Sequence, residues 1–291
     1  MSSPSKDKRG IPLIPPIASE MLRDLIITPS RDPFVVLPCV AEQTNNARHW
    51  IDPKTLPLRE PIETYYARDP YPIPAVSDRE GYYGDDRHLD WWLSGLRDFL
   101  AVEQNFLQYN GTLGNGRRIL ELGCASGRAL RHFVCHAPDA QTWGCDINLR
   151  HVEWIRQFLP PYIPVFQNTI LPHLPIEDRF FDLVCAFSVF THIDHLELAW
   201  LAEVRRILKP GGIAYFSIHG ETTWSKMGPE VPAYNSLMNA RNEIKGPEVN
   251  EALFEGPIPE PKTVFAWETI RNYNSNVFHT TEYIHDPKKS S

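Results

Sequence analysis

Residues 117–127 read RRILELGCASG, a short apolar run that ends in a turn of small residues. The next apolar side chains, Leu130, Phe133, Val134 and Ala137, follow the i, i+3, i+4, i+7 spacing of a helix face. A buried strand that passes through a glycine turn into a helix is the opening unit of many α/β sheets. This stretch therefore predicts where the folded core begins its first strand.

The same alternation continues downstream. Further strands are predicted at 142–147 (TWGCDI), 162–168 (YIPVFQN), 181–190 (FDLVCAFSVF) and 212–220 (GIAYFSIHG), with helices around 152–159 and 201–208. Lys209-Pro210-Gly211-Gly212 is a combined helix stop and turn signal. Residues 181–190 are apolar on both faces, as a central parallel strand should be. We predict an α/β fold with a doubly wound, mostly parallel sheet.

The flanks of this region differ in composition. Many of the 27 prolines fall in residues 1–80, which we interpret as an extended, proline-rich arm, partly disordered, with a short helical turn at 19–27. Leucine and aromatic spacing predicts a helix at 89–107, ahead of the first strand. We assign residues 81–220 to the ligand-binding domain. Residues 221–291 form an irregular segment that either covers the substrate side or leaves the sheet incompletely closed.

Bulk composition narrows the classes of function. The chain has 291 residues and a net charge of -7, which disfavours a dedicated nucleic-acid binder. No apolar run reaches the roughly 18–20 residues that span a bilayer, so no membrane partner is expected. The five cysteines (Cys39, Cys124, Cys135, Cys145, Cys185) show no CxxC spacing, and no metal site is predicted. We expect reduced thiols and a cytoplasmic location.

The small-residue turn suits an anionic or nucleotide-like ligand, because the helix after it presents open N–H groups and a positive dipole end. Asp146 ends the second predicted strand, 19 residues after Gly127. An acid at that place can accept hydrogen bonds from both hydroxyls of a ribose. The alternative is that Asp146 only stabilises the start of the next helix, together with Asn148.

The charge of the turn separates two kinds of adenosine ligand. A dinucleotide site needs GxGxxG, whereas this chain has Gly123-x-x-x-Gly127 with Ala125 between. Glu121 would repel a diphosphate but suits a ligand with an α-amino group. An amino-acid-bearing adenosine is therefore favoured over a nicotinamide dinucleotide.

Residues 117–219 resemble the core of the class I (Rossmann-like) S-adenosylmethionine-dependent methyltransferases, whose glycine motif reads LELGCGxG. Further landmarks agree in order: Asp146-Ile147, Asn168, Leu174-Pro175 with Phe181-Asp182, the segment Ser188–His192, and Leu208–Gly212. The resemblance covers about a third of the chain. It implies a transferase that uses S-adenosylmethionine (SAM) as its cofactor.

The resemblance also implies which residues bind the cofactor. Glu121 would face the methionine amine, and the turn Gly123, Cys124, Ala125, Ser126 and Gly127 would contact the methionine moiety. Asp146 would bind the ribose, while Ile147 and Asn168 would lie near the adenine. Ser188 belongs to the segment after the fourth strand. Tyr83, with Tyr82, would cover the sulfonium, or it packs on the surface.

The chain departs from the family pattern in two places. Ala125 replaces the usual central glycine, a mild change if its φ is negative. The family closes its sheet with an antiparallel sixth and seventh strand, but after His219 only 263–267 and 276–278 look strand-like. That hairpin is displaced, supplied by these short strands, or missing.

Candidate catalytic residues lie beyond the fourth and fifth strands. A general base is needed only if the acceptor is a hydroxyl or a protonated amine. His192 is the best placed base, and the alternative is a structural histidine that caps the next helix beside Asp194. His219 ends the fifth strand at the same edge.

These observations lead to one predicted function and two alternatives. We expect a SAM-dependent methyltransferase for a small-molecule acceptor, with O- or N-methylation favoured over C-methylation. The segment after the fourth strand also lacks the Asn-Pro-Pro-Tyr type of tetrapeptide that many base-modifying relatives carry. The alternatives are a SAM-binding protein with other or no chemistry, and a nicotinamide-dependent oxidoreductase. An extended arm invites exchange between subunits, so a homodimer through the arm is also considered.

Overall fold

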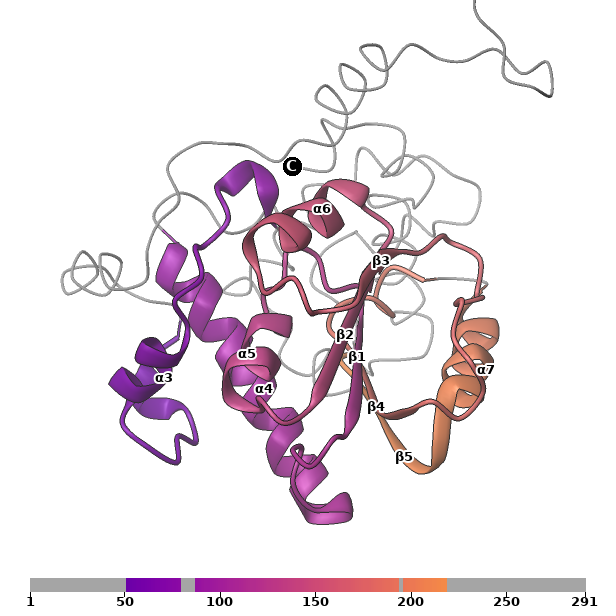
Figure 1. Ribbon diagram of the computed structural model, residues 1–291, viewed down its shortest axis with the longest axis horizontal. Helices are drawn as coiled ribbons and strands as arrows, with labels where there is room; N and C mark the ends of the chain where they lie inside the picture. Colours follow the sequence, from indigo (N-terminus) through magenta and orange to yellow (C-terminus); the bar gives the residue numbers. More distant parts are fainter. Residues whose placement is uncertain (1–50, 80–86, 194–195, 219–291) are drawn as a thin grey trace, which may run out of the picture.

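The computed structural model describes residues 51–79, 87–193 and 196–218, and its centre is a five-stranded parallel sheet (Figure 1). The strands are β1 (Arg118–Leu122), β2 (Gln141–Asp146), β3 (Val165–Gln167), β4 (Phe181–Ala186) and β5 (Leu208–Phe216). Their order is β3-β2-β1-β4-β5, and every neighbouring pair is parallel. The doubly wound parallel sheet predicted from the sequence is confirmed.

Four helices belong to the sheet domain: α4 (His88–Asn110), α5 (Leu130–His136), α6 (Leu149–Phe158) and α7 (Glu197–Ile207). Figure 1 shows α4, α5 and α6 on one side of the sheet and α7 on the other. Each coincides with a helix predicted from apolar spacing. The structure extends the first of them by one residue at its start and three at its end.

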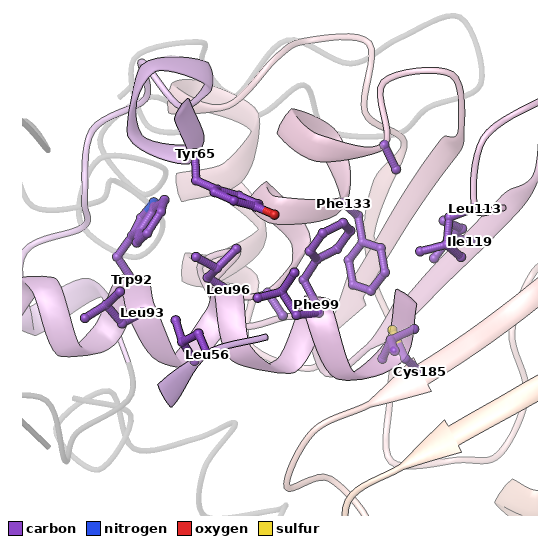
Figure 2. Close-up of a cluster of buried hydrophobic side chains, with 14 of the residues drawn as sticks. Leu56, Tyr65, Trp92, Leu93, Leu96, Phe99, Leu113, Ile119, Phe133 and Cys185 are labelled. Carbon is purple, nitrogen blue, oxygen red and sulfur yellow. The ribbon is translucent and has the colours of Figure 1, made fainter. Parts of the chain in front are cut away.

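The central strands bury both faces, which explains their continuous apolar runs. Ile119 and Cys185 belong to the hydrophobic cluster under α4 and α5, parts of which Figure 2 shows. Their chain neighbours Leu120 and Val184 belong to the cluster under α7. Because successive side chains alternate between faces, a strand that lies between two helical layers needs apolar residues at nearly every position.

The turn predicted at Lys209–Gly212 does not precede the fifth strand but lies within it. Helix α7 ends at Ile207 as expected, yet β5 begins at Leu208, which pairs with Phe181. The register then shifts, and Ile213 is the partner of Leu183. The residues between them bulge out of the ladder, with Gly211 at φ 78°. A bulge accommodates extra residues without ending the pairing, which is why the turn signal and the strand coexist.

Residues 51–79 pack against α4 and α5. They include the 3-10 helices η2 (Pro53–Thr55) and η3 (Val76–Asp78) and the α-helix α3 (Ile62–Arg68). Leu56 and Tyr65 are buried in the same cluster as Trp92 of α4, as Figure 2 shows. The predicted turn at 19–27 lies outside the described residues. The division of the chain at residues 80 and 220 stays a prediction.

A buried ion pair joins this segment to α5. Arg131 donates from Nε and Nη2 to the two carboxylate oxygens of Asp69, at 2.6 and 2.7 Å, and both side chains are fully buried. Arg131 also donates to the carbonyls of Tyr71 and Pro72. The indole Nε1 of Trp92 donates to Asp69 at 2.7 Å. One carboxylate therefore connects residues 69–72, α4 and α5.

Two stacked histidines lie beside this ion pair. The rings of His132 and His136 are 5.4 Å apart, and Tyr65 packs edge-on against His136. Burial lowers the pKa of both, against the attraction of Asp69, and brings that of His136 from 6.5 to about 4. Both imidazoles are therefore neutral in the folded domain at neutral pH.

The folded domain is expected to lose stability as the pH falls from about 6.5 to about 4. In that window the unfolded chain binds protons at these histidines while the folded domain does not, so acid favours unfolding. Urea denaturation at several pH values should show a flatter pH dependence for His136→Gln than for the unchanged protein. His173→Gln is the control, because its side chain is 80% exposed. Equal pH dependence in all three proteins would contradict this assignment.

The outer edge of β5 faces away from the other strands. Within the described residues β5 pairs with β4 alone. A groove of about 640 Å³ runs between β5 and α7, lined by residues that include Leu201, Arg205, Ala214 and Phe216. The strand-like stretches 263–267 and 276–278, which would close the sheet, lie outside the described residues. No helix in the described part of the chain is long and apolar enough to cross a membrane.

The cysteines of the described region carry no disulfide. Cys124, Cys145 and Cys185 are buried, and Cys135 is partly buried. Burial raises the pKa of each of these thiols, with smaller contributions from nearby carboxylates. The thiols are therefore neutral packing residues, as expected. Cys39 lies outside the described residues.

Candidate functional site

The carboxyl ends of β1, β2 and β4 meet at one edge of the sheet. The strand order reverses between β1 and β4, since the chain proceeds outward through β2 and β3 on one side and through β5 on the other. Open α/β sheets bind ligands in the crevice at such a switch point. The turn at 123–127 follows β1 there, and Asp146 is the last residue of β2.

The turn after β1 requires glycine at both of its ends. Gly123 and Gly127 have φ values of 72° and 88°, which lie in the left-handed region. A Cβ at Gly123 would lie 2.2 Å from Cγ2 of Val189, and one at Gly127 would lie 2.9 Å from Cδ1 of Leu159. Val189 and Leu159 therefore leave no room for a side chain at either end of the turn. We call this turn, residues 123–127, the glycine cradle.

Ala125, between these glycines, has a φ of 45°. The expectation of a mild substitution depended on a negative φ, and the structure contradicts that condition. A Cβ in the left-handed region costs roughly 1–2 kcal/mol. The neighbouring contacts hold the conformation in place, because the Ala125 N–H donates to Oδ2 of Asp146 at 2.8 Å.

Ala125→Gly is expected to stabilise the ligand-free domain by about 0.5–1 kcal/mol. The gain in the folded state exceeds the extra freedom that glycine gives the unfolded chain. Urea denaturation of the two proteins measures the difference. Ala129→Gly is the matched control and should destabilise, because Ala129 is fully buried with a right-handed backbone at φ -92°. A loss of stability in Ala125→Gly would show that the positive φ of Ala125 is not strained.

Asp146 stabilises the start of the next helix, as the alternative interpretation holds, and its binding of a ribose stays a prediction. Its Oδ1 accepts the N–H of Asn148, the N-cap of α6, and its Oδ2 accepts the N–H of Ala125, each at 2.8 Å. It therefore stabilises the helix start and ties the glycine turn to β2. Each carboxylate oxygen keeps a second lone pair, so the side chain can still accept from a ligand.

Several buried polar atoms at this edge have no hydrogen-bond partner among the described residues. Two of them are Oγ of Ser126, whose residue is fully buried, and Oδ1 of Asn168, whose residue is 7% exposed. The Asn168 N–H donates to the Asp146 carbonyl at 3.1 Å, which holds the side chain beside β2. Buried polar atoms are normally satisfied, so this pair fits a polar ligand in the cradle.

The remaining residues predicted from the turn and β2 lie around this cradle. Glu121 is 2% exposed and pairs in register with Gly144 and Cys185. Cys124 is buried, and Ile147 is half-buried with its carbonyl accepting from Gln167. The structure thus brings the predicted residues of β1, the turn, β2 and β3 to one edge.

The segment after β4 borders the same edge. Ser188 is exposed at φ 60°, and its N–H donates to Oγ of Ser217 at 2.6 Å. His192 is half-buried, and its N–H donates to the carbonyl of Val189 at 2.9 Å. The N-cap of α7 is Leu196, whose side chain makes no cap hydrogen bond, and both interpretations of His192, as a base and as a structural histidine, stay predictions. His219, Tyr82 and Tyr83 lie outside the described residues.

Sequence reasoning missed several side chains of this edge. Val189 packs on Gly123, Ser217 links the ends of β4 and β5, and Arg150 donates to Asp78 of η3 at 2.6 Å. No local pattern marks these contacts, because each joins residues far apart in the chain. His151 was also missed, although its place on the first turn after Asp146 could have drawn attention to it.

The sheet order, the glycine cradle and the acidic end of β2 are the features expected of a class I SAM-dependent methyltransferase domain. In such a domain the cradle would hold the methionine part of SAM, and the end of β2 would hold its ribose. The buried atoms of Ser126 and Asn168 fit that cofactor, since both can hydrogen-bond to an adenosyl amino acid.

Comparison with known proteins agrees with this class. Residues 120–216 match the model of a methyltransferase domain family. A sterol 24-C-methyltransferase of Gibberella zeae is 29% identical over 119 residues, which are 39% of this chain and 30% of that protein. A ubiquinone/menaquinone biosynthesis C-methyltransferase of Cupriavidus pinatubonensis is 30% identical over 105 residues, 33% of this chain and 41% of that protein.

Among solved structures, SAM-bound CalS10, an amino pentose methyltransferase from Micromonospora echinaspora, is 19% identical. The match covers 45% of this chain and 51% of that one, with a TM-score of 0.37. The chain spans well under half the length of the two C-methyltransferases that it matches. Residues 120–216 are thus similar to methyltransferase domains, and their parallel sheet has the class I fold.

Proposed function

We propose that this chain transfers a methyl group from SAM to a small-molecule acceptor. The observation that carries the proposal is the cradle formed by Gly123 and Gly127 beside Asp146, at the switch point of the sheet. SAM supplies an electrophilic methyl group on a sulfonium centre. The protein's contribution is to hold the acceptor in line with that methyl group and to exclude water.

Each cofactor-binding residue has a proposed role. Glu121 accepts from the amino group, and the turn from Gly123 to Gly127 surrounds the methionine moiety. Asp146 accepts from the ribose, while Ile147 and Asn168 contact the adenine. Ser188 contacts the cofactor from the segment after β4. Tyr83 covers the sulfonium, and His192 or His219 takes a proton from an acceptor that must lose one.

The acceptor is proposed from the charge of the chain and from its relatives. The net charge of -7 disfavours nucleic acid, and the two relatives are named for small molecules, a sterol and a quinone. Both are named as C-methyltransferases, which supports a carbon acceptor over the oxygen or nitrogen favoured from the sequence. The assay must therefore detect methyl transfer to carbon, oxygen and nitrogen. The cytoplasmic location and a homodimer through the arm stay predictions.

Calorimetry with S-adenosylhomocysteine (SAH), SAM and NAD tests the cofactor assignment. Micromolar binding of SAH is expected, with none of NAD. Asp146→Asn should weaken SAH by about tenfold or more, because the amide replaces a charged acceptor and can accept only one of the two backbone N–H groups. Asp139→Asn, at an exposed acid, is the control. Binding of NAD without SAH would refute the proposal.

Catalysis needs a separate test. The protein is incubated with SAM carrying a labelled methyl group and a metabolite extract, and SAH release and labelled products are measured. Labelled product with stoichiometric SAH is the expected result. Binding of SAM without any transfer would favour the alternative of a SAM-binding protein that is not a methyltransferase.

A further inference from the structure

His151 is a buried imidazole on the first turn of α6. The residue is 2% exposed, and neither ring nitrogen has a hydrogen-bond partner among the described residues. Its position is five residues after Asp146, the acid that ends β2. Buried polar side chains are almost always hydrogen-bonded, so a partner outside the described residues is implied.

The carboxylate of Asp146 lies close to this ring. Nδ1 of His151 lies 3.8 Å from Oδ1 of Asp146, too far for a direct hydrogen bond. The interval is short enough for one oxygen atom placed beside both groups to hydrogen-bond with each of them. The imidazole therefore points toward the acid that lies at the carboxyl edge of the sheet.

The two side chains have complementary chemistry. The Asp146 carboxylate can only accept, and each of its oxygens already accepts one backbone N–H. A hydroxyl that donates to Asp146 still has acceptor lone pairs to satisfy. A neutral imidazole can donate one N–H, which is what the carboxylate lacks. Together they match a hydroxyl that donates to one partner and accepts from the other.

We propose that His151 binds a ribose hydroxyl of the adenosyl cofactor, donating from Nδ1 to the same hydroxyl that donates to Asp146. The inference rests on the proposed function, since it needs the adenosyl group at the end of β2. It makes His151 a ligand-contacting residue that distinguishes ribosyl from deoxyribosyl ligands.

The test is calorimetry of SAH and its 2′-deoxy and 3′-deoxy analogues with the unchanged protein, His151→Leu and His151→Asn. His151→Leu removes the donor, whereas His151→Asn keeps an amide N–H near the position of Nδ1. His173→Leu, at an exposed histidine, is the matched control. Folding of each variant is checked by circular dichroism.

In the unchanged protein, one of the two deoxy analogues should bind about tenfold more weakly than SAH. His151→Leu should bind SAH about tenfold more weakly but should bind that analogue as well as the unchanged protein does, so the difference between the two ligands should shrink to the bond with Asp146. His151→Asn should stay within about threefold of the unchanged protein. A loss in His151→Leu that is equal for all three ligands would overturn the proposal, because packing or a bridging water would explain it.

A second measurement keeps the proposal testable if His151→Leu does not fold. In protein labelled with ¹⁵N-histidine, NMR should show His151 protonated at Nδ1 and its Nδ1 resonance shifted by SAH but less by the critical analogue. The same shift with all three ligands would overturn it. If the unchanged protein binds no SAH at all, the proposed function itself fails. If SAH binds, but the loss from His151→Leu and the loss from removing the hydroxyl are additive, only the role of His151 fails.

Discussion

Arg131→Met is expected to lower the free energy of unfolding by about 3–5 kcal/mol. The substitution leaves the Asp69 carboxylate buried without its cation, and it removes the donors to the carbonyls of Tyr71 and Pro72. Residues 51–79 should then detach from α5. Urea denaturation measures the loss, and proteolysis should cut first within this segment.

The charge of Asp69 is what makes the loss large. Burial by itself would raise the pKa of Asp69, but the charge and hydrogen bonds of Arg131 lower it from 3.8 to about 2. The stabilisation is therefore present above pH 3.8 and is lost as the pH falls through about 2. Removing Arg131 reverses this balance, because the cost of burying the carboxylate is then opposed mainly by the hydrogen bond from Trp92.

Two variants separate the buried charge from lost packing. The double variant Asp69→Asn with Arg131→Met should recover part of the stability, because no charge stays buried and the amide still accepts from Trp92. Arg68→Met should change stability by less than about 1 kcal/mol, since Arg68 and Glu60 pair at the surface. A double variant no more stable than Arg131→Met would contradict the role of the charge.

Gly95→Ala is expected to cost about 3 kcal/mol, at the upper end for overpacking. Gly95 lies in α4, and a Cβ there would be 2.0 Å from the backbone oxygen of Arg128 and 2.9 Å from the His132 ring. The clash involves backbone, so no side-chain rotation relieves it. Because Arg128 directly follows Gly127, the displacement of its backbone should also reach the turn at residues 123–127.

Denaturation and SAH calorimetry together test this close approach. Gly95→Ala should lose stability and should also bind SAH more weakly. Gly114→Ala is the control and should stay within about 0.5 kcal/mol, because its Cβ would only touch Asp139, at 3.7 Å. Equal stability of the two variants would show that α4 does not need a glycine against α5.

Local sequence patterns predicted the secondary-structure elements of the sheet domain. Apolar alternation and helical spacing placed all five strands and the four sheet-packing helices, because each element buries its own face. The candidate site residues Gly123, Gly127 and Asp146 were also predictable. Their types at strand ends indicate one kind of turn and one kind of ligand.

Contacts between distant residues were not predictable in this way. Helix propensity around Gly95 and Arg131 gives no sign of a backbone contact or of a carboxylate 62 residues earlier in the chain. The turn signal at Lys209–Gly212 was correct locally, but pairing with β4 turned it into a bulge inside β5. The positive φ of Ala125 likewise depends on the bond that Asp146 makes to its N–H.

The sequence by itself determined the sheet, its flanking helices and the glycine turn with its acid, since these follow from periodicity and from what glycine and aspartate can do. Only the tertiary structure decided how residues 51–79 attach, which backbone positions are strained and where the buried His151 points. Those features are set by close approach across the fold, where a few tenths of an ångström decide between contact and clash.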